Sequence, residues 1–155
     1  MKKIVIVLVA MMFVLATASA FAETATSSLQ VSANVAASCR ISSVTNVVFT
    51  NPYDPTDPAN NDSGTVDFSF RCTRGTSYDL YITGTRQMAS GGDTLNFELY
   101  TNAARTTTWP SSSPGVTGTS GSNAPITRDI YGRINALQDV QAGAYTGTVT
   151  ITVQY

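Results

Sequence analysis

The chain has 155 residues, enough for one domain with a sizeable core. It carries nine Lys plus Arg, ten Asp plus Glu and no His, and no basic run that could neutralise the phosphates of a nucleic acid. The absence of histidine excludes the Ser/His/Asp and Cys/His catalytic schemes, so we expect neither an enzyme nor a cofactor. Abundant Thr, Ser, Gly and Val indicate an all-β, secreted protein.

Residues 1–22 have the organisation of an export signal. Two lysines precede an apolar run over residues 4–16, and Ala20–Ala22 fits a small-x-small cleavage site, with Ala18–Ala20 as a second candidate. We expect a mature chain that begins at Glu23, and loss of the two lysines takes the formal net charge from −1 to −3. The alternative is a retained membrane anchor, although the run is shorter than the roughly 20 residues of a full span.

An N-terminal extension, residues 23–38, lies between the signal and the first cysteine. Its apolar side chains at alternate positions are Leu29, Val31, Ala33 and Val35. Polar residues stand between them, and this period of two predicts an extended strand. The pattern alone does not say to which sheet the strand belongs.

The two cysteines, Cys39 and Cys72, are an even number in a chain with an export signal, which predicts one disulfide. Closing this loop of about 34 residues would stabilise the fold by roughly 3–4 kcal/mol in the chain-entropy model. The alternative is a pair of free, buried thiols.

Six segments from Cys39 onward have strand patterns separated by turn signals. In chain order they are residues 39–50 (interrupted around Ser43–Asn46), 64–72, 77–83, 95–100, 126–134 and 144–155. The proline-rich residues 51–63 and the Gly/Ser-rich residues 111–123 predict loops, the second of them mobile. An immunoglobulin-like sandwich needs seven strands, so six predict an incomplete immunoglobulin-like β-sandwich over residues 39–155.

A tyrosine that follows a glycine turn, in Gly143-Ala-Tyr145, leads into the last predicted strand. This arrangement resembles the tyrosine corner at the start of strand F in immunoglobulin-like folds. The strand ending at Tyr155 would then be strand F, strand G would be missing, and an open groove with unpaired backbone would lie beside strand F. The alternative is an ordinary turn followed by a core tyrosine.

The chain resembles the spore coat protein U and archaic chaperone–usher pilin family. The resemblance rests on the order and spacing of three stretches, Tyr53–Thr83, Leu95–Trp109 and Ile130–Tyr155. The chain departs from the family at Gly147, because the family often has Asp two residues after the corner tyrosine. The resemblance implies a pilus subunit that a periplasmic chaperone completes first with a strand of its own. At the outer-membrane usher, the N-terminal extension of the next identical or related subunit would replace that strand.

The resemblance also implies roles for particular residues. The four alternate apolar residues of the extension would form a donor strand, and burial of Leu29, Val31 and Val35 would contribute on the order of 5–8 kcal/mol before ordering costs. The candidate walls of the acceptor groove are Ile41, Val47 and Phe49 on one side and Val149, Ile151, Val153 and Tyr155 on the other. The alternatives are a plain core role for these walls and an extension that fills the groove of its own chain.

The predicted function is therefore structural: a subunit of a cell-surface pilus, exported through the periplasm and used for adhesion and biofilm formation. The alternatives are a spore or cell-surface coat protein of the same fold and a pilus-tip or adaptor adhesin.

The acidic segment Asp54–Asp62 lacks the Gly and Glu of an EF-hand loop, so we expect a proline-stiffened turn and no metal site. The arginines are dispersed along the sequence and indicate no site.

Overall fold

The computed structural model describes residues 23–155, so the export signal predicted at residues 1–22 lies outside the described part. The chain divides into a unit that ends at Ala33 and a domain, Asn34–Tyr155, which is described here by itself. The domain contains strands and no helix, which confirms the all-β prediction. Its strands are β1 (Cys39–Val44), β2 (Asn61–Cys72), β3 (Ser77–Thr83), β4 (Gln87–Ser90), β5 (Asp93–Asn96), β6 (Glu98–Tyr100), β7 (Val116–Thr119), β8 (Ile126–Ile134) and β9 (Thr150–Gln154). Among the described residues, no helix is available to cross a membrane.

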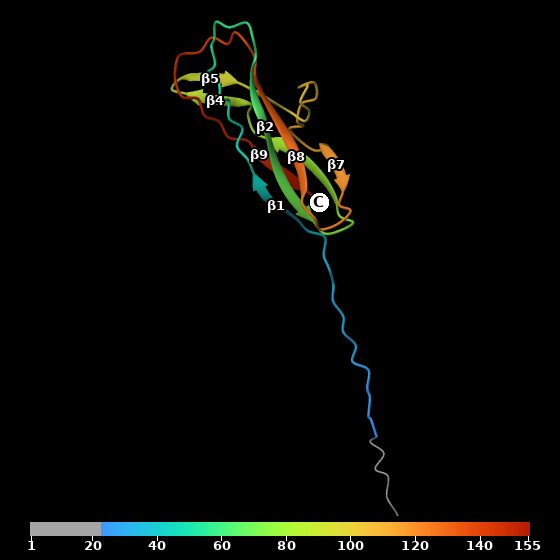
Figure 1. The fold of residues 1–155 in the computed structure, drawn as a ribbon. Coiled ribbons are helices and arrows are strands. Elements are labelled where there is room, and N and C mark those ends of the chain that lie inside the picture. The colour runs from blue at the N-terminus through green and yellow to red at the C-terminus, as the bar shows by residue number, and fades with distance from the viewer. Residues whose placement is uncertain (1–22) are drawn as a thin grey trace, which may run out of the picture. The chain divides into compact units, whose positions relative to one another are not determined.

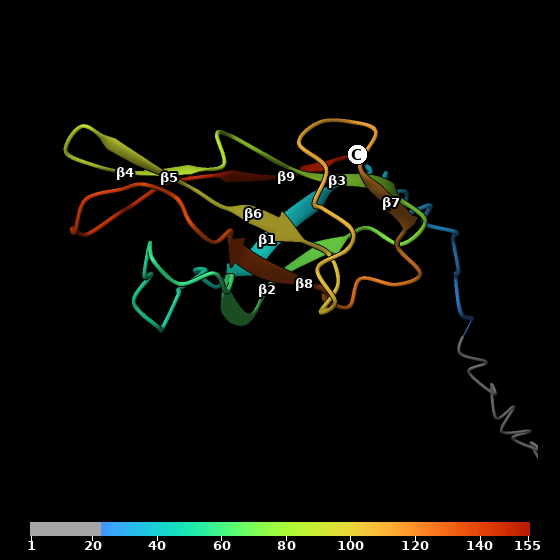
Figure 2. The ribbon, with the colours of Figure 1, turned by 90° about the horizontal axis from the view of Figure 1, so that it is seen from above.

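Two antiparallel sheets form the layers of a sandwich (Figure 1). One sheet has the strand order β1-β2-β8-β6, the other has the order β7-β3-β9, and β4 pairs with β5 in a separate hairpin. Figure 2 shows β3 and β9 in one layer and β2 and β8 in the other. The edge strands that matter for the site are β1 in the first sheet and β9 in the second.

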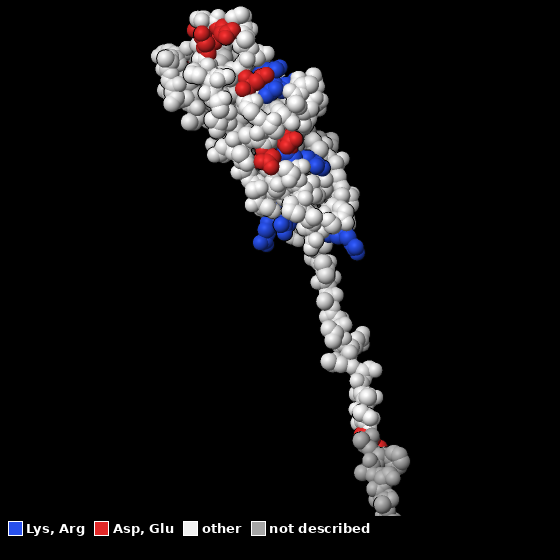
Figure 3. All heavy atoms as spheres, in the orientation of Figure 1, with Lys and Arg blue, Asp and Glu red and all other residues white. Residues whose placement is uncertain are grey.

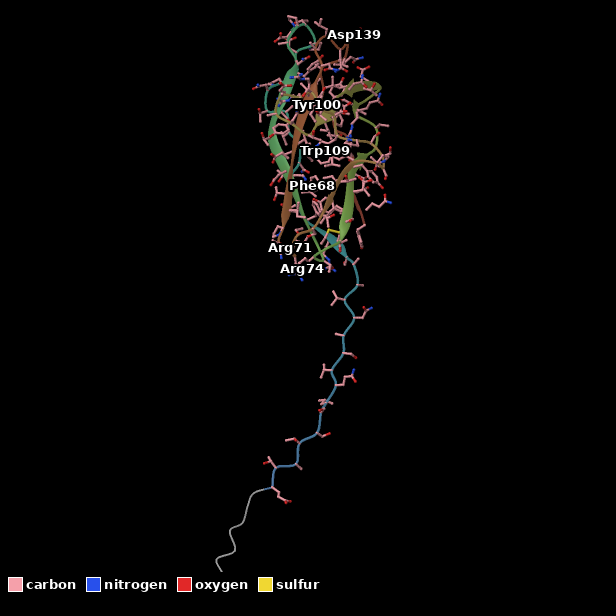
Figure 4. All side chains as sticks on the ribbon, turned by 90° about the vertical axis from the view of Figure 1, so that its right-hand side faces the viewer. Phe68, Arg71, Arg74, Tyr100, Trp109 and Asp139 are labelled. Carbon is pink, nitrogen blue, oxygen red and sulfur yellow. A yellow bond between two sulfur atoms is a disulfide. The ribbon has the colours of Figure 1, made fainter. Side chains whose placement is uncertain are left out.

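The core lies between these layers and follows the alternation of β2 and β3. Phe68 and Phe70 of β2 are fully buried, and the ring of Phe70 meets that of Tyr78 of β3 edge to face at 4.9 Å. Trp109 packs on Phe68, and its indole N–H donates to the carbonyl of Asp129 at 3.3 Å (Figure 4). Each large apolar side chain buried in this way contributes about 1.5–3 kcal/mol.

The predicted disulfide is confirmed: Cys39 and Cys72 are bonded to each other and are direct cross-strand partners on β1 and β2. The pairing continues one step beyond the cysteines, because the Thr73 amide donates to the carbonyl of Ser38 at 2.8 Å. The disulfide therefore fixes the start of an edge strand to the centre of its sheet.

Each of the six predicted segments contains a strand, but the structure has nine strands, for three reasons. Residues 95–100 span parts of β5 and β6, which belong to different sheets. The segment 111–123, predicted as a mobile loop, contains β7, which pairs with β3. Gly118 permits this pairing, because a Cβ there would lie 2.5 Å from the hydroxyl oxygen of Tyr78. The four-residue β4 was not predicted.

The boundaries of other predicted strands also shift. The second strand begins at Asn61 rather than residue 64, and the last begins at Thr150 rather than residue 144. The first strand is shorter than predicted: its register with β2 shifts between Ile41 and Ser43, and β1 ends at Val44, so residues 45–50 form no strand.

The tyrosine corner is confirmed. The hydroxyl of Tyr145 donates to the carbonyl of Gln141, four residues upstream, at 2.8 Å, which is the contact that defines such a corner at the start of strand F. Desolvation raises the pKa of Tyr145 above its usual value, and the carboxylate of Asp93 raises the pKa further. The strand that the corner leads into, β9, therefore occupies the position of strand F.

Candidate functional site

An apolar groove of about 500 Å³ opens along one edge of the sandwich. One wall is the chain from Val44 to Phe49, which follows β1, and the other is the chain from Tyr145 to Ile151, which leads into β9. Between the walls lie side chains of β3, β4, β6 and β8 and of the link between β5 and β6, namely Ile82, Met88, Leu99, Ile130 and Phe97.

Both walls carry unpaired backbone. β1 and β9 are edge strands, each with only one neighbour among the described strands. Beyond the bond from the Thr45 amide to the Asp67 carbonyl at 2.9 Å, residues 46–50 make no backbone–backbone hydrogen bond within the described part of the chain. A groove with apolar pockets and free backbone groups on both sides has the chemistry needed to accept an additional strand.

The two walls run in opposite directions. The chain at 44–49 leads away from the disulfide, whereas β9 runs back toward it, since Gln154 pairs with Asp79 near the turn that follows Cys72. A strand laid between the walls would therefore be antiparallel to one wall and parallel to the other.

Two glycines allow the walls to pack closely. A Cβ on Gly132 of β8 would lie 2.9 Å from Val47 Cγ1 and 3.1 Å from Phe49 Cζ, so the first wall rests directly on the backbone of β8. A Cβ on Gly147 would collide with the carbonyl oxygen of Gln87, the first residue of β4. The residue that replaces the family's common Asp at position 147 is thus held close to the backbone of a neighbouring strand.

One half-buried arginine ties the strands beneath the groove together. Arg86 Nη2 donates to the carbonyls of Ile82 at 3.1 Å and Trp109 at 3.4 Å, and its Nε lies 3.4 Å from a carboxylate oxygen of Glu98. Burial lowers the pKa of Arg86 from its usual value, while Glu98 opposes this change. The contacts join the end of β3 to β6 and so hold both sheets in place under the groove.

Of the seven residues predicted as groove walls, four line the groove: Val47, Phe49, Val149 and Ile151. The other three lie outside it. Ile41 is 38% exposed on β1, Val153 packs against the core, and Tyr155 is 60% exposed near the start of β3. The acceptor role of all seven stays a prediction, because no bound strand is present to test it.

The sequence did not single out the residues between the walls. They come from five different segments, and local patterns predict strands at Ile82, at Phe97 with Leu99, and at Ile130, but not that these side chains meet in one groove. Met88 lies on β4, a strand that was not predicted.

The predicted donor residues are exposed in the described extension. Leu29, Val31 and Val35 are 87%, 84% and 77% exposed, and Ala33 is exposed as well. No regular secondary structure is present from residue 23 to 38. The donor role stays a prediction.

The acidic segment Asp54–Asp62 uses its carboxylates in local turns. Asp54 Oδ1 accepts from the Thr56 hydroxyl at 2.7 Å and from the Thr56 amide at 2.8 Å, and these bonds lower the pKa of Asp54. Asp57 accepts from the Ala59 amide in the same way. Within residues 23–155 no group of three His, Cys, Asp or Glu side chains is placed to hold a metal ion.

Comparison with known proteins shows the family and the fold. The Spore Coat Protein U domain family matches residues 25–152. A crystal structure from the archaic chaperone–usher Csu pili of Acinetobacter baumannii, the CsuC–CsuE chaperone–tip adhesion subunit pre-assembly complex, is similar over 78% of this chain with 22% identity and a TM-score of 0.56. This chain spans only 40% of the matched chain. The likeness confirms the predicted immunoglobulin-like fold class. No curated protein matches the chain by sequence.

Proposed function

The chain belongs to the Spore Coat Protein U domain family, and we propose that it is a structural subunit of an archaic chaperone–usher surface pilus that polymerises by donor-strand complementation. The observation that carries the proposal is the apolar groove between two edge strands with unpaired backbone. The exposed, alternating apolar residues of the extension supply a matching strand.

The donor segment fits the groove in length and in period. Residues 29–35 span about 20 Å as a strand, at roughly 3.3 Å per residue, and the six residues of the first wall span a similar length. A donor strand would place its four apolar side chains toward the groove and its polar side chains outward. Because a slip by one residue would reverse the two faces, the alternation also sets the register.

A neighbour's groove is proposed, rather than the chain's own, because the connection to the domain is short. To fill its own groove, the extension would turn back at Ala36–Ser38 and run antiparallel to the strand that follows. Counting outward from that turn places Leu29 beside Thr45 and leaves only Ala25, Thr26 and Ser27 beside the wall at 47–49, so no large apolar side chain reaches it. In a neighbour's groove, all four apolar residues can reach the pockets.

The partners in this proposal follow from the exposed groove. Before a neighbour arrives, the apolar groove would promote aggregation, so a periplasmic chaperone is proposed to cover it with a strand. Exchange would take place at an outer-membrane usher, and the partner would be an identical or related subunit. The resulting fibre would serve adhesion and biofilm formation, and the role is structural rather than catalytic.

The family name favours a second candidate, a coat protein of the same fold. Immunogold electron microscopy of the producing cells separates the two candidates. Label along extended fibres supports the pilus subunit, whereas label confined to a continuous layer supports the coat protein.

The donor role is tested by two substitutions on adjacent residues. Val31→Asp places a charge on the face that would enter the groove, and Ser32→Asp places the same charge on the opposite face, so the second variant is a matched control. We expect Val31→Asp, like deletion of Thr24–Val35, to leave chaperone binding intact and to abolish fibre growth, while Ser32→Asp polymerises normally. Normal fibres from the deletion variant would overturn the proposal.

A further inference from the structure

Three arginines that are dispersed in the sequence gather at one end of the domain. Arg40 and Arg71 are direct cross-strand partners on β1 and β2, and Arg74 lies in the turn after β2. All three are exposed and line one hollow of the surface beside Ser38 and Asn123. Figures 3 and 4 show this basic end at the disulfide end of the domain.

The opposite end of the domain is acidic. Figure 4 places Asp139 at this end, and Figure 3 shows acidic side chains there. The segment Asp54–Asp62 and the start of β5 at Asp93 join the chain next to Asp139. Hydrogen bonds hold these segments together: the hydroxyl of Tyr53 accepts from the Gln138 amide at 2.7 Å, and Asp93 accepts from the Gln141 amide at 3.1 Å. The acidic end is defined here by Asp54, Asp57, Asp93 and Asp139.

The charges at the two ends are not neutralised within the described chain. The ion pairs among residues 23–155 join Arg86 with Glu98 and both Arg105 and Arg133 with Asp62, and none involves the basic end or the four aspartates of the acidic end. Arg40 and Arg71 face each other across two strands, which is destabilising for like charges. Each end therefore presents an excess of one sign to a partner.

We propose that the acidic end of one subunit docks against the basic end of the next subunit in the fibre, so that the partner of each end is a second copy of this chain. This inference rests on the proposed donor-strand function. It adds a contact between the folded domains that the donor strand itself does not make.

The direction of the inserted strand brings these two ends together. The sheet β7-β3-β9 is antiparallel throughout, and a strand that continues this pattern beside β9 runs opposite to β9. Because β9 runs from the acidic end to the basic end, the inserted strand would leave the groove at the acidic end. The chain of the donor subunit then enters its own domain at Cys39, at the basic end.

The short connection after the donor segment keeps the two ends close. Only Ala36–Ser38 stand between Val35 and Cys39, so these two residues are at most about 14 Å apart. The hydroxyl of Thr73 donates to the Ala36 carbonyl at 3.2 Å, so part of this connection is already fixed to the donor's basic end. This upper limit exceeds the Debye length of about 8 Å at physiological ionic strength, so the attraction between the two ends should be strongest at low salt, where the Debye length reaches about 30 Å at 0.01 M. Insertion in the reverse direction would bring two basic ends together.

The inference is tested by reversing the charge at each end of the mature chain, residues 23–155. Arg71→Glu with Arg74→Glu makes both ends acidic, because only Arg40 then opposes the two glutamates. Asp57→Lys, Asp93→Lys and Asp139→Lys make both ends basic, because only Asp54 then opposes the three lysines, and the five changes together restore opposite signs at every junction. Asp67→Lys with Asp129→Lys, on cross-strand partners midway along β2 and β8, is the control for charge reversal away from the ends. Fibre elongation is followed by light scattering at low and at high salt.

We expect each single-end reversal to slow elongation by about tenfold or more at low salt, and the variant that combines both reversals to recover the original rate. The differences should vanish at high salt, where the Debye length falls to a few ångströms. Elongation of the single-end variants at the rate of the control, or no recovery in the combined variant, would overturn the inference. Thermal melting identifies any variant that fails to fold, and Arg71→Gln with Arg74→Gln then replaces the charge reversal.

A synthetic peptide, Thr24–Ser38, distinguishes failure of this inference from failure of the proposed function. The peptide carries the donor residues but none of the three arginines. If it blocks elongation of all variants equally while charge reversal has no effect, the donor-strand function stands and the docking of the ends is wrong. If the unmodified chain forms no fibre, or the peptide does not block growth, both proposals fail.

Discussion

Gly132 of β8 supports one wall of the groove, so adding a single methyl group there should damage the fold and the groove together. The added Cβ would lie 2.9 Å from Val47 Cγ1, 3.0 Å from Ser63 Oγ and 3.1 Å from Phe49 Cζ. The backbone of Gly132 is outside the left-handed region, so the strain comes from these contacts alone. Side-chain atoms would have to retreat by about half an ångström to reach an ordinary separation near 3.5 Å. We expect Gly132→Ala to lower the free energy of unfolding by about 1–3 kcal/mol.

The assay combines urea denaturation, followed by the fluorescence of the buried Trp109, with the concentration of donor peptide that blocks fibre elongation. Gly64→Ala on β2 is the matched control, because a Cβ on Gly64 meets no atom within 4 Å. Gly132→Ala should lower the urea midpoint and raise the peptide concentration required, and addition of Val47→Ala should restore part of both. Equal behaviour of Gly132→Ala and Gly64→Ala in both measurements would refute the packing argument.

Three further predictions concern stability. Tyr145→Phe removes the corner hydrogen bond and should lower the midpoint of urea denaturation; an unchanged midpoint would contradict a stabilising corner. Reduction of Cys39–Cys72 should cost roughly 3–4 kcal/mol, and unchanged melting in the presence of reductant would count against this. The hydrogen bond from Arg133 lowers the pKa of Asp62, so its stabilising effect is present above the unfolded pKa of about 3.9 and is lost as the pH falls through the folded value. Asp62→Asn should therefore weaken the fall in stability below about pH 4, and identical acid titrations of both proteins would disprove this assignment.

The parts of the fold that sequence alone predicts are those with strong local patterns. Residues 77–83 and 126–134 alternate large apolar and polar side chains, and both form strands with the predicted limits. The corner at Tyr145 was predictable because its contact spans four residues. The disulfide was predictable because only one pairing of two cysteines exists within the chain.

The elements that sequence missed depend on contacts between distant segments. β7 is rich in Thr and Gly and has little apolar periodicity, yet it forms because β3 offers it a free edge and Gly118 fits against Tyr78. The division between β5 and β6 depends on which neighbour each one finds, β4 or β8. A local pattern cannot specify such a choice, because the same alternation suits either sheet.

The candidate site shows the same limit. Half of the groove was predictable, since Val47, Phe49, Val149 and Ile151 lie on segments whose alternation marks an inward face. The side chains between the walls come largely from strands whose order in the sheets the sequence does not predict.

The basic end depends even more on the fold. Arg40 and Arg71 look unrelated in the sequence, and they become partners because the disulfide sets the register of β1 and β2. The same disulfide also fixes Cys39, four residues after Val35, at the end of the extension. One covalent link thus determines where the basic charge gathers and its distance along the chain from the proposed donor residues. Charge reversal at the ends and truncation of the extension therefore address two functions of one local arrangement.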